Sequence, residues 1–298
     1  MAEMSNMEIP VPPGFTITTE VCNYFTENKN LPNSLDNEIR QAVSKLENLS
    51  DKCFGGEGTP LLLSVRSGGR VSMPGMMDSI LNIGLNDSNV SQLAEAFNDE
   101  RFALDSYRRL IQMYSNVVLG VEHERFEAVL ANKKRMDNVV SDADFNVDQL
   151  NWIINAYKNT VERFTDSLFP QEPYEQLTGA IEAVFNSWQN KRAATYRKIN
   201  NIPDSWGTGA TIQTMVFGNL NDKSGTGVAF TRNPSNGDKE LYGEYLINAQ
   251  GEDVVAGIRT PHPITKHSKV EQESLESKFP KAYKAVSYTH LRAHETSR

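Results

Sequence analysis

Cysteine is scarce in this sequence, because its 298 residues include only Cys22 and Cys53. A fold held together by several disulfides is therefore excluded, and neither cysteine stands in a spacing typical of metal ligands. No apolar run approaches the length of a membrane span, and the residues from Met1 to Pro13 lack the charged-then-apolar order of a secretory leader. The sequence therefore predicts two reduced thiols and a cytoplasmic chain that has no membrane partner.

An excess of basic residues is also missing. The chain has 30 Lys and Arg against 38 Asp and Glu, which gives a formal net charge of −8. This balance argues against nucleic acid as a partner, although a local basic surface is compatible with the total. The hydrophobic content of 39% is ordinary for a globular protein, and the length is sufficient for two or three packed units.

Hydrophobic periodicity predicts mixed helix and strand. The run from Leu61 to Val65 is typical of a buried strand, and a helix is expected to begin near Met76, include Ile80 and end at Gly84. Three- and four-residue steps predict an amphipathic helix before Ser50, with Ile39, Val43 and Leu46 on one face, and helices through most of 90–197. After Pro203 the period changes to two, which predicts strands at residues 210–217, 227–231 and 240–247. The expected fold class is α+β, with a helical insert between α/β parts.

The segment after the first predicted strand carries the chemistry that is easiest to interpret. Arg66 follows the apolar run, and Ser67, Gly68, Gly69 and Arg70 come next. Glycines let a backbone approach a ligand closely, and guanidinium groups match the planar oxygens of a phosphate. Taken alone, this pattern fits a phosphate loop and a glycine turn with solvated arginines about equally well.

Longer motifs carry a resemblance to a known family. The segments in question are 64–68, 73–78, 81–84, 105–115, 169–173, 213–219, 225–235 and 243–253. In this order, between about Ile9 and Thr265, they resemble the nucleotide-binding domain of the pyruvate, phosphate dikinase family. The resemblance implies an ATP-grasp-like nucleotide-binding fold with a helical insert, in which two lobes close over ATP.

The resemblance also implies a division of the chain. Residues 1–89 and 198–222 are expected to form a first α/β subdomain, and residues 90–197 a helical subdomain. Residues 223–267 are expected to belong to a second lobe, and 268–298 to a divergent tail. From about residue 286 the tail resembles translated sequencing-adaptor read-through rather than the family, and the alternative is a genuine flexible tail. His290 and His294 are therefore not interpreted as a metal pair.

Several residues are expected to contact ATP by position in the family's motifs. Arg66 matches an arginine that holds ATP phosphates, and the strand with Gln213, Met215 and Val216 resembles the adenine side of the site. An ordinary core strand explains the latter pattern equally well. Thr226 and Gly227, with Arg232 nearby, stand where a glycine turn could face the phosphates. Glu252 and Asp253 are candidate carboxylates for Mg²⁺, the expected cofactor with ATP, while a solvated acidic turn is the alternative for at least one of them. For Arg108 and Arg109, we expect one salt-bridged and one exposed residue.

The family's full enzyme converts ATP, phosphate and pyruvate to AMP, pyrophosphate and phosphoenolpyruvate through a phosphohistidine on a separate domain. The resemblance therefore implies a phosphotransferase whose phosphohistidine and pyruvate-binding domains are partners of this part, and a homodimeric parent. A Gly-Gly-Lys-Gly element, later acidic strands and the phosphohistidine segment are expected to be absent here. No catalytic residue is assigned, and the chain alone is expected to be inactive. The alternatives are the ATP domain of phosphoenolpyruvate synthase and a non-catalytic nucleotide-binding module.

Overall fold

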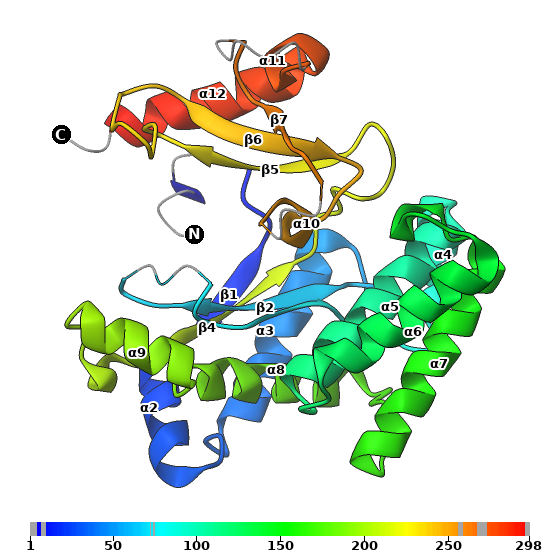
Figure 1. Cartoon of the computed structure of the whole chain (residues 1–298). Helices are drawn as coiled ribbons and strands as arrows, with labels where there is room; N and C mark the ends of the chain where they lie inside the picture. Colours follow the sequence, from blue (N-terminus) through cyan, green and yellow to red (C-terminus); the bar gives the residue numbers. More distant parts are fainter. Residues whose placement is uncertain are drawn as a thin grey trace. The chain divides into compact units, whose positions relative to one another are not determined.

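The computed structural model of the chain describes residues 5–6, 10–71, 73, 75–255, 259–266 and 273–295, without the side chains of residues 252, 255 and 289–295. Two compact units are present. The larger spans Pro12–Met215, and the smaller combines Met1–Val11 with Val216–Arg298. Each unit contains an antiparallel sheet and helices (Figure 1), so the expected α+β class is confirmed. The predicted subdomain limits and the origin of the tail stay predictions.

The sheet of the larger unit has four strands in the order β1-β4-β2-β3. These strands are β1 (Gly14–Ile17), β4 (Gly209–Thr214), β2 (Leu63–Gly68) and β3 (Ser79–Ile83), and every neighbouring pair is antiparallel. Side chains alternate between the two faces of a strand. One face therefore carries a row of directly paired apolar residues, and this row is Phe15, Ile212, Val65 and Ile80.

Helices supply the apolar partners of this sheet. Helix α8 (Pro173–Ser187) packs against β2, β3 and β4, and α2 (Thr19–Asn28) packs against both α8 and β4. Helix α3 (Leu35–Ser50) buries Ile39, Val43 and Leu46, as their three- and four-residue spacing predicted, and also Leu35. Helix α9 (Lys191–Ile199) and the 3₁₀ turn η2 (Asp204–Trp206) follow α8 along the chain, and a second 3₁₀ turn, η1 (Asp142–Asp144), lies between α6 (His123–Asp137) and α7 (Val147–Thr165).

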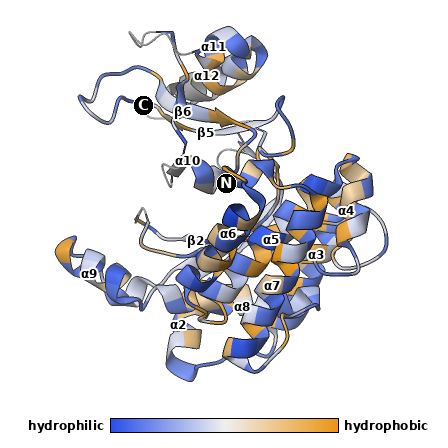
Figure 2. Ribbon diagram, turned by 45° about the vertical axis from the view of Figure 1, so that its right-hand side comes forward, coloured by the Kyte–Doolittle hydropathy of each residue, from blue (hydrophilic) through white to orange (hydrophobic). Residues whose placement is uncertain are grey.

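A group of long helices packs at the β3 side of the sheet. Helix α5 (Glu100–Val117) contacts β3, α4 (Val90–Phe97) and α7 (Val147–Thr165), and α6 (His123–Asp137) contacts α7. Apolar residues gather where α5, α7 and α8 lie together (Figure 2). The helical interpretation of these segments is therefore confirmed. Among the described helices, none combines the length and the apolar character needed to cross a bilayer.

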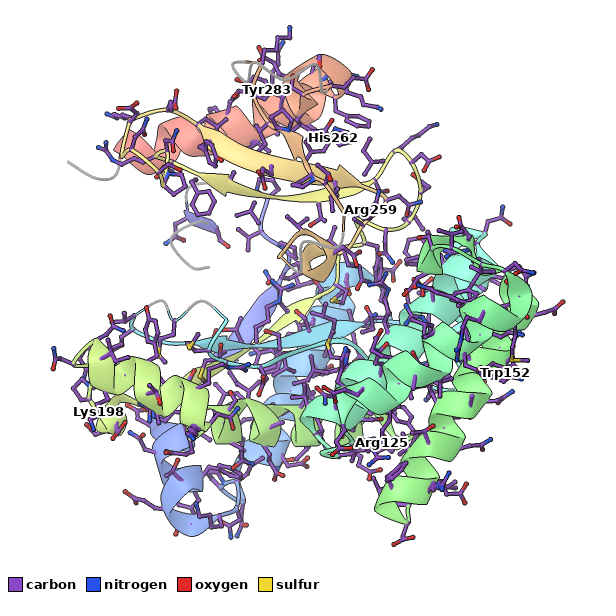
Figure 3. All side chains as sticks on the ribbon, viewed as in Figure 1. Arg125, Trp152, Lys198, Arg259, His262 and Tyr283 are labelled. Atoms are coloured by element: carbon purple, nitrogen blue, oxygen red, sulfur yellow. The ribbon has the colours of Figure 1, made fainter. Side chains whose placement is uncertain are left out.

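The smaller unit is built on a three-stranded sheet. Its order is β5-β6-β7, with β5 (Gly225–Phe230), β6 (Tyr242–Ile247) and β7 (His262–Pro263). Three helices belong to it, namely α10 (Gly251–Val255), α11 (Leu275–Lys278) and α12 (Pro280–Glu295). Tyr245, Ile264 and Leu275 form its buried core, and Tyr283 of α12 packs against them (Figure 3).

The expected helix from Met76 to Gly84 is wrong, because residues 79–83 form strand β3. Ile80 pairs with Val65, and both side chains are fully buried on one face of the sheet. Gly84 ends the strand with a φ of 106°, where an added Cβ would lie 2.8 Å from the Phe54 ring. Pairing with β2 and packing against α5 thus decided a short apolar run that fits helix and strand periodicity alike.

Candidate functional site

Arg66 lies in strand β2, where it pairs directly with Ser79 of β3 and Thr211 of β4. The side chain reaches solvent, yet burial by the surrounding protein lowers the pKa of its guanidinium group. Within the described part of the chain, Arg66 has no ion pair and no side-chain hydrogen bond. A partly desolvated cation without a carboxylate partner is a suitable contact for an anion.

The glycine loop lies at the end of the strand that carries Arg66. A hollow of about 480 Å³ opens there, and its lining includes Gly68, Gly69, Met73, Met77 and Trp188. Its wall also includes Ser67, Ser79 and Thr208, so hydroxyl groups lie beside bare backbone and beside apolar and thioether side chains. Such a mixture can hold a ligand that combines an anionic part with an apolar part.

Asp78 anchors the segment that leads from this loop into β3. Its carboxylate accepts hydrogen bonds from Arg192 and Asn190, both at 3.2 Å. Its N–H donates to the hydroxyl of Ser187 at 3.5 Å. The residues that hold this segment come from the end of α8 and the start of α9, far away in sequence. No local motif could have revealed them.

Arg70 is the second arginine of the sequence motif, and it lies apart from the strand. Its guanidinium carbon lies 5.6 Å from the centre of the Trp206 ring, which is a cation–π contact. The two arginines of this motif therefore lie in different environments. Arg66 belongs to the paired strand, and Arg70 is an exposed residue beside η2.

Gln213 belongs to an interior strand, and its side-chain amide donates to the carbonyl of Pro12 at 2.9 Å. Its own carbonyl accepts the Ser64 hydroxyl at 3.3 Å. Met215 and Val216 follow the end of β4, and the Met215 N–H donates to Leu62 at 2.9 Å. In the described residues, the Met215 carbonyl and the Val216 N–H make no hydrogen bond. Because these two groups belong to one trans peptide unit, they point in opposite directions, and only one of them can face a given ligand edge.

Thr226 and Gly227 lie within strand β5 rather than in a turn. They pair with Leu246 and Tyr245 of β6. Both line a hollow of about 240 Å³, most of whose other lining residues are apolar, such as Ile264. The close approach of the strands requires glycine at position 227, since an added Cβ would lie 2.5 Å from the Glu244 carbonyl oxygen. Arg232, farther along the chain, donates to the carbonyl of Gly237 in an exposed turn.

The two carboxylates proposed for Mg²⁺ fall in the short helix α10. Asp253 accepts the backbone N–H of Gln250 at 2.8 Å, which is the contact of a helix N-terminal cap. The side chain of Glu252 lies outside the described residues. Among the residues that the structure describes, no group of three or more His, Cys, Asp or Glu side chains could hold a metal ion. One carboxylate from α10 is compatible with Mg²⁺, which binds one or two carboxylates together with water and phosphate oxygens.

Arg108 and Arg109 both bind Asp105 on helix α5, so the expectation that one of them is exposed is wrong. The Arg108 guanidinium lies 2.8 Å from Asp105, and Arg109 lies 3.0 Å from the other carboxylate oxygen. Burial alone would raise the pKa of Asp105, but the two guanidinium groups outweigh it and hold that pKa well below its usual range. These arginines therefore stabilise the helical part and do not belong to the glycine loop.

Comparisons with known proteins agree with the motifs. A family model described as the pyruvate phosphate dikinase AMP/ATP-binding domain matches residues 1–53 and 27–297. Pyruvate, phosphate dikinases from Rhizobium meliloti and Clostridium symbiosum are each 51% identical over 95% of this chain and 32% of their own length. The chloroplastic enzyme of Mesembryanthemum crystallinum is 48% identical over 96% of the chain and 29% of the relative. The chain thus spans about a third of the length of these relatives.

The names of these relatives do not favour phosphoenolpyruvate synthase, the closest alternative in the sequence analysis. The matches also cover both units and the motifs on which the resemblance depends. The chain belongs to the pyruvate phosphate dikinase AMP/ATP-binding domain family.

Proposed function

We propose that this chain binds ATP and that Arg66 contacts its phosphates. The observation that carries the proposal is the environment of Arg66, which lies on a strand beside a glycine loop, is partly desolvated, and has no carboxylate partner among the described residues. An anion brought to this position restores a partner to the charge. The bidentate geometry of a guanidinium group also orients the phosphate it binds.

The adenine end of the nucleotide lies, in this proposal, against Met215 and Val216. In the described residues neither the Met215 carbonyl nor the Val216 N–H has a hydrogen-bond partner, and since these groups share one trans peptide unit and point in opposite directions, one of them meets the adenine edge. Gln213 acts indirectly by holding the Pro12 carbonyl. Thr226, Gly227, Glu252 and Asp253 complete the proposed set, with the two carboxylates assigned to Mg²⁺ that accompanies the phosphates.

The whole protein is proposed to be a pyruvate, phosphate dikinase with an ATP-grasp-like nucleotide-binding part. It would convert ATP, phosphate and pyruvate to AMP, pyrophosphate and phosphoenolpyruvate through a phosphohistidine on another domain. Phosphoryl transfer depends mainly on positioning and charge neutralisation, and this chain would supply both for ATP. The family membership supports this proposal. We also propose that the protein acts in the cytoplasm.

The test compares Arg66→Ala and Arg66→Lys with the unchanged chain by calorimetric titration with ATP. A charge-assisted hydrogen bond is typically worth about 1.5–3 kcal/mol, which is roughly a ten- to hundredfold change in affinity. Alanine should lose most of the phosphate-dependent affinity. Lysine should recover only part of it, because it keeps the charge but not the fork.

Arg125→Ala is the matched control. Arg125 pairs with Glu122 and lies over the Phe164 ring on the helical side of the same unit (Figure 3), so its loss should leave ATP affinity unchanged. Equal ATP binding by the parent chain and both Arg66 variants would show that Arg66 is only a surface residue.

A further inference from the structure

The strand register aligns four polar side chains in one row across the sheet of the larger unit. Thr16 of β1 pairs with Thr211 of β4, Thr211 pairs with Arg66 of β2, and Arg66 pairs with Ser79 of β3. Directly paired residues point to the same face, with Cβ atoms about 4.5–5.5 Å apart. We call these four residues the hydroxyl row. It places a hydroxyl-bearing residue on each side of Arg66 in the sheet.

The side chains of the hydroxyl row are accessible to solvent, unlike those of the apolar row on the other face of the sheet. Thr16, Arg66 and Ser79 are exposed and Thr211 is half-buried, whereas Ile212, Val65 and Ile80 of the apolar row are fully buried on the opposite face. An alternation of this kind places one face in the core and leaves the other available for a ligand.

Glycines keep one side of the hydroxyl row open. The next pair on the same face is Gly68 with Gly209, which presents backbone without side chains. An added Cβ at Gly68 would lie 3.3 Å from the Thr211 hydroxyl oxygen, so a side chain there would crowd that group. A ligand can therefore approach Thr211 and Arg66 together from this side.

The hydroxyls of Thr16 and Thr211 form one hydrogen bond with each other, which uses one of their two protons and leaves the other available to a ligand. Their oxygens lie 3.1 Å apart, and either can be the donor. No other side-chain hydrogen bond involves Thr16 or Thr211 in the described residues. When Thr16 donates to Thr211, the Thr211 proton is free to point at a further acceptor beside the guanidinium of Arg66. A cation with an adjacent O–H donor fits two oxygens of one phosphate.

We infer that Thr211 donates a hydrogen bond to the phosphate group that Arg66 binds, and that Thr16 is the positioning residue that orients the Thr211 hydroxyl. This inference depends on the proposed ATP function and adds a phosphate contact outside the glycine loop. Thr211 and Thr16 lie in strands far apart in sequence, and only the register joins them to Arg66.

Thr211→Val removes the hydroxyl and keeps the β-branched shape that suits a strand. Calorimetric titrations of the chain with ATP, tripolyphosphate and adenosine should show a loss of about tenfold or more for the two phosphate ligands. Adenosine binding should stay unchanged. Thr16→Val should weaken the same two ligands by a smaller factor, and Thr16→Ser should restore them, because serine keeps the donor. Urea unfolding midpoints confirm that each variant is folded.

Ser64→Ala is the matched control. Ser64 is on the same face of β2, but its hydroxyl already donates to the Gln213 carbonyl, so ATP affinity should not change. If Thr211→Val binds ATP like the parent while Arg66→Ala does not, the inference is wrong and the proposed function stands. If neither variant changes ATP binding, both are wrong. An equal loss for ATP and adenosine would assign Thr211 a general structural role and also overturn the inference.

Discussion

At the scale of single residues, Arg66, Arg108 and Arg197 differ in their partners. Arg108 is buried against Asp105, and Arg197 is buried between Asp204, at 2.7 Å, and the Trp188 ring. Each of these charges has a carboxylate, as buried cations require. Arg66 has none in the described residues, although burial lowers its pKa. That difference is the basis on which we propose Arg66, and neither of the other two arginines, as a phosphate contact.

The substitution Asp253→Asn tests whether Asp253 binds Mg²⁺ or only caps helix α10. Asparagine keeps an oxygen that can accept the Gln250 N–H, so thermal unfolding of the variant should stay close to that of the parent. Loss of the carboxylate charge should weaken ATP binding in the presence of Mg²⁺ and leave metal-free ATP binding unchanged. Titrations with and without Mg²⁺ measure this difference, and Asp238→Asn, in an exposed turn of the same unit, is the control. An unchanged Mg²⁺ effect would remove Asp253 from the metal site.

At the scale of elements, a cluster of charged residues joins helix α5 to the polar segment that follows α6. We call it the Asp105 cluster, and its members are Arg101, Asp105, Arg108, Arg109, Lys134 and Asp142. Arg101 donates to the carbonyls of Asp142 and Phe145, Lys134 pairs with Asp142, and Arg108 lies 4.0 Å from the same carboxylate. Breaking a buried pair by removing one partner leaves an uncompensated charge and typically costs about 3–5 kcal/mol. The helices are therefore held by electrostatics as well as by apolar packing.

Asp105→Asn should lower the free energy of unfolding by several kcal/mol, on the order of that penalty. Urea denaturation at neutral pH measures the change. Asp36→Asn is the matched control, because its pair with Arg40 lies on the exposed surface of α3, where solvent screening leaves an ion pair little effect on stability. If the two substitutions had equal effects, the buried cluster would not be a major stabilising contact.

The same carboxylate predicts a pH dependence. Because the folded-state pKa of Asp105 is held below the unfolded value of about 3.9, its contribution is fully present above that pH. It should be lost progressively as the pH falls toward the folded-state pKa. The difference in unfolding free energy between the parent and Asp105→Asn should therefore shrink below about pH 4. A difference that stays constant to lower pH would contradict this assignment.

At the scale of the whole molecule, the chain spans about a third of the length of its relatives. We expect these 298 residues alone to bind ATP without making phosphoenolpyruvate, because the proposed transfer requires a phosphohistidine and a pyruvate site on other domains. Incubation with ATP, phosphate, pyruvate and Mg²⁺, followed by assays for AMP and phosphoenolpyruvate, tests this. Turnover above a protein-free blank would contradict the proposed division of labour.

Periodicity and motif order were enough to predict much of this chain. Helix α3, the helices within residues 90–197 and strands β4, β5 and β6 follow from spacing, because a helix or strand face repeats at a fixed interval. The order of several long motifs predicted the family. Arg66 was a candidate from local sequence, since a strand end beside glycines is visible there.

Only the tertiary structure decided which distant residues accompany Arg66. Thr16 and Thr211 join it through the pairing of β1, β4 and β2, and a shift of one residue would move each hydroxyl to the opposite face. Strand β3 was mistaken for a helix for a related reason, because its pairing with β2 and its contacts with α5 outweigh an ambiguous local period. The sequence by itself determined the alternation of each strand, and tertiary packing determined the register that turns separate strands into one row.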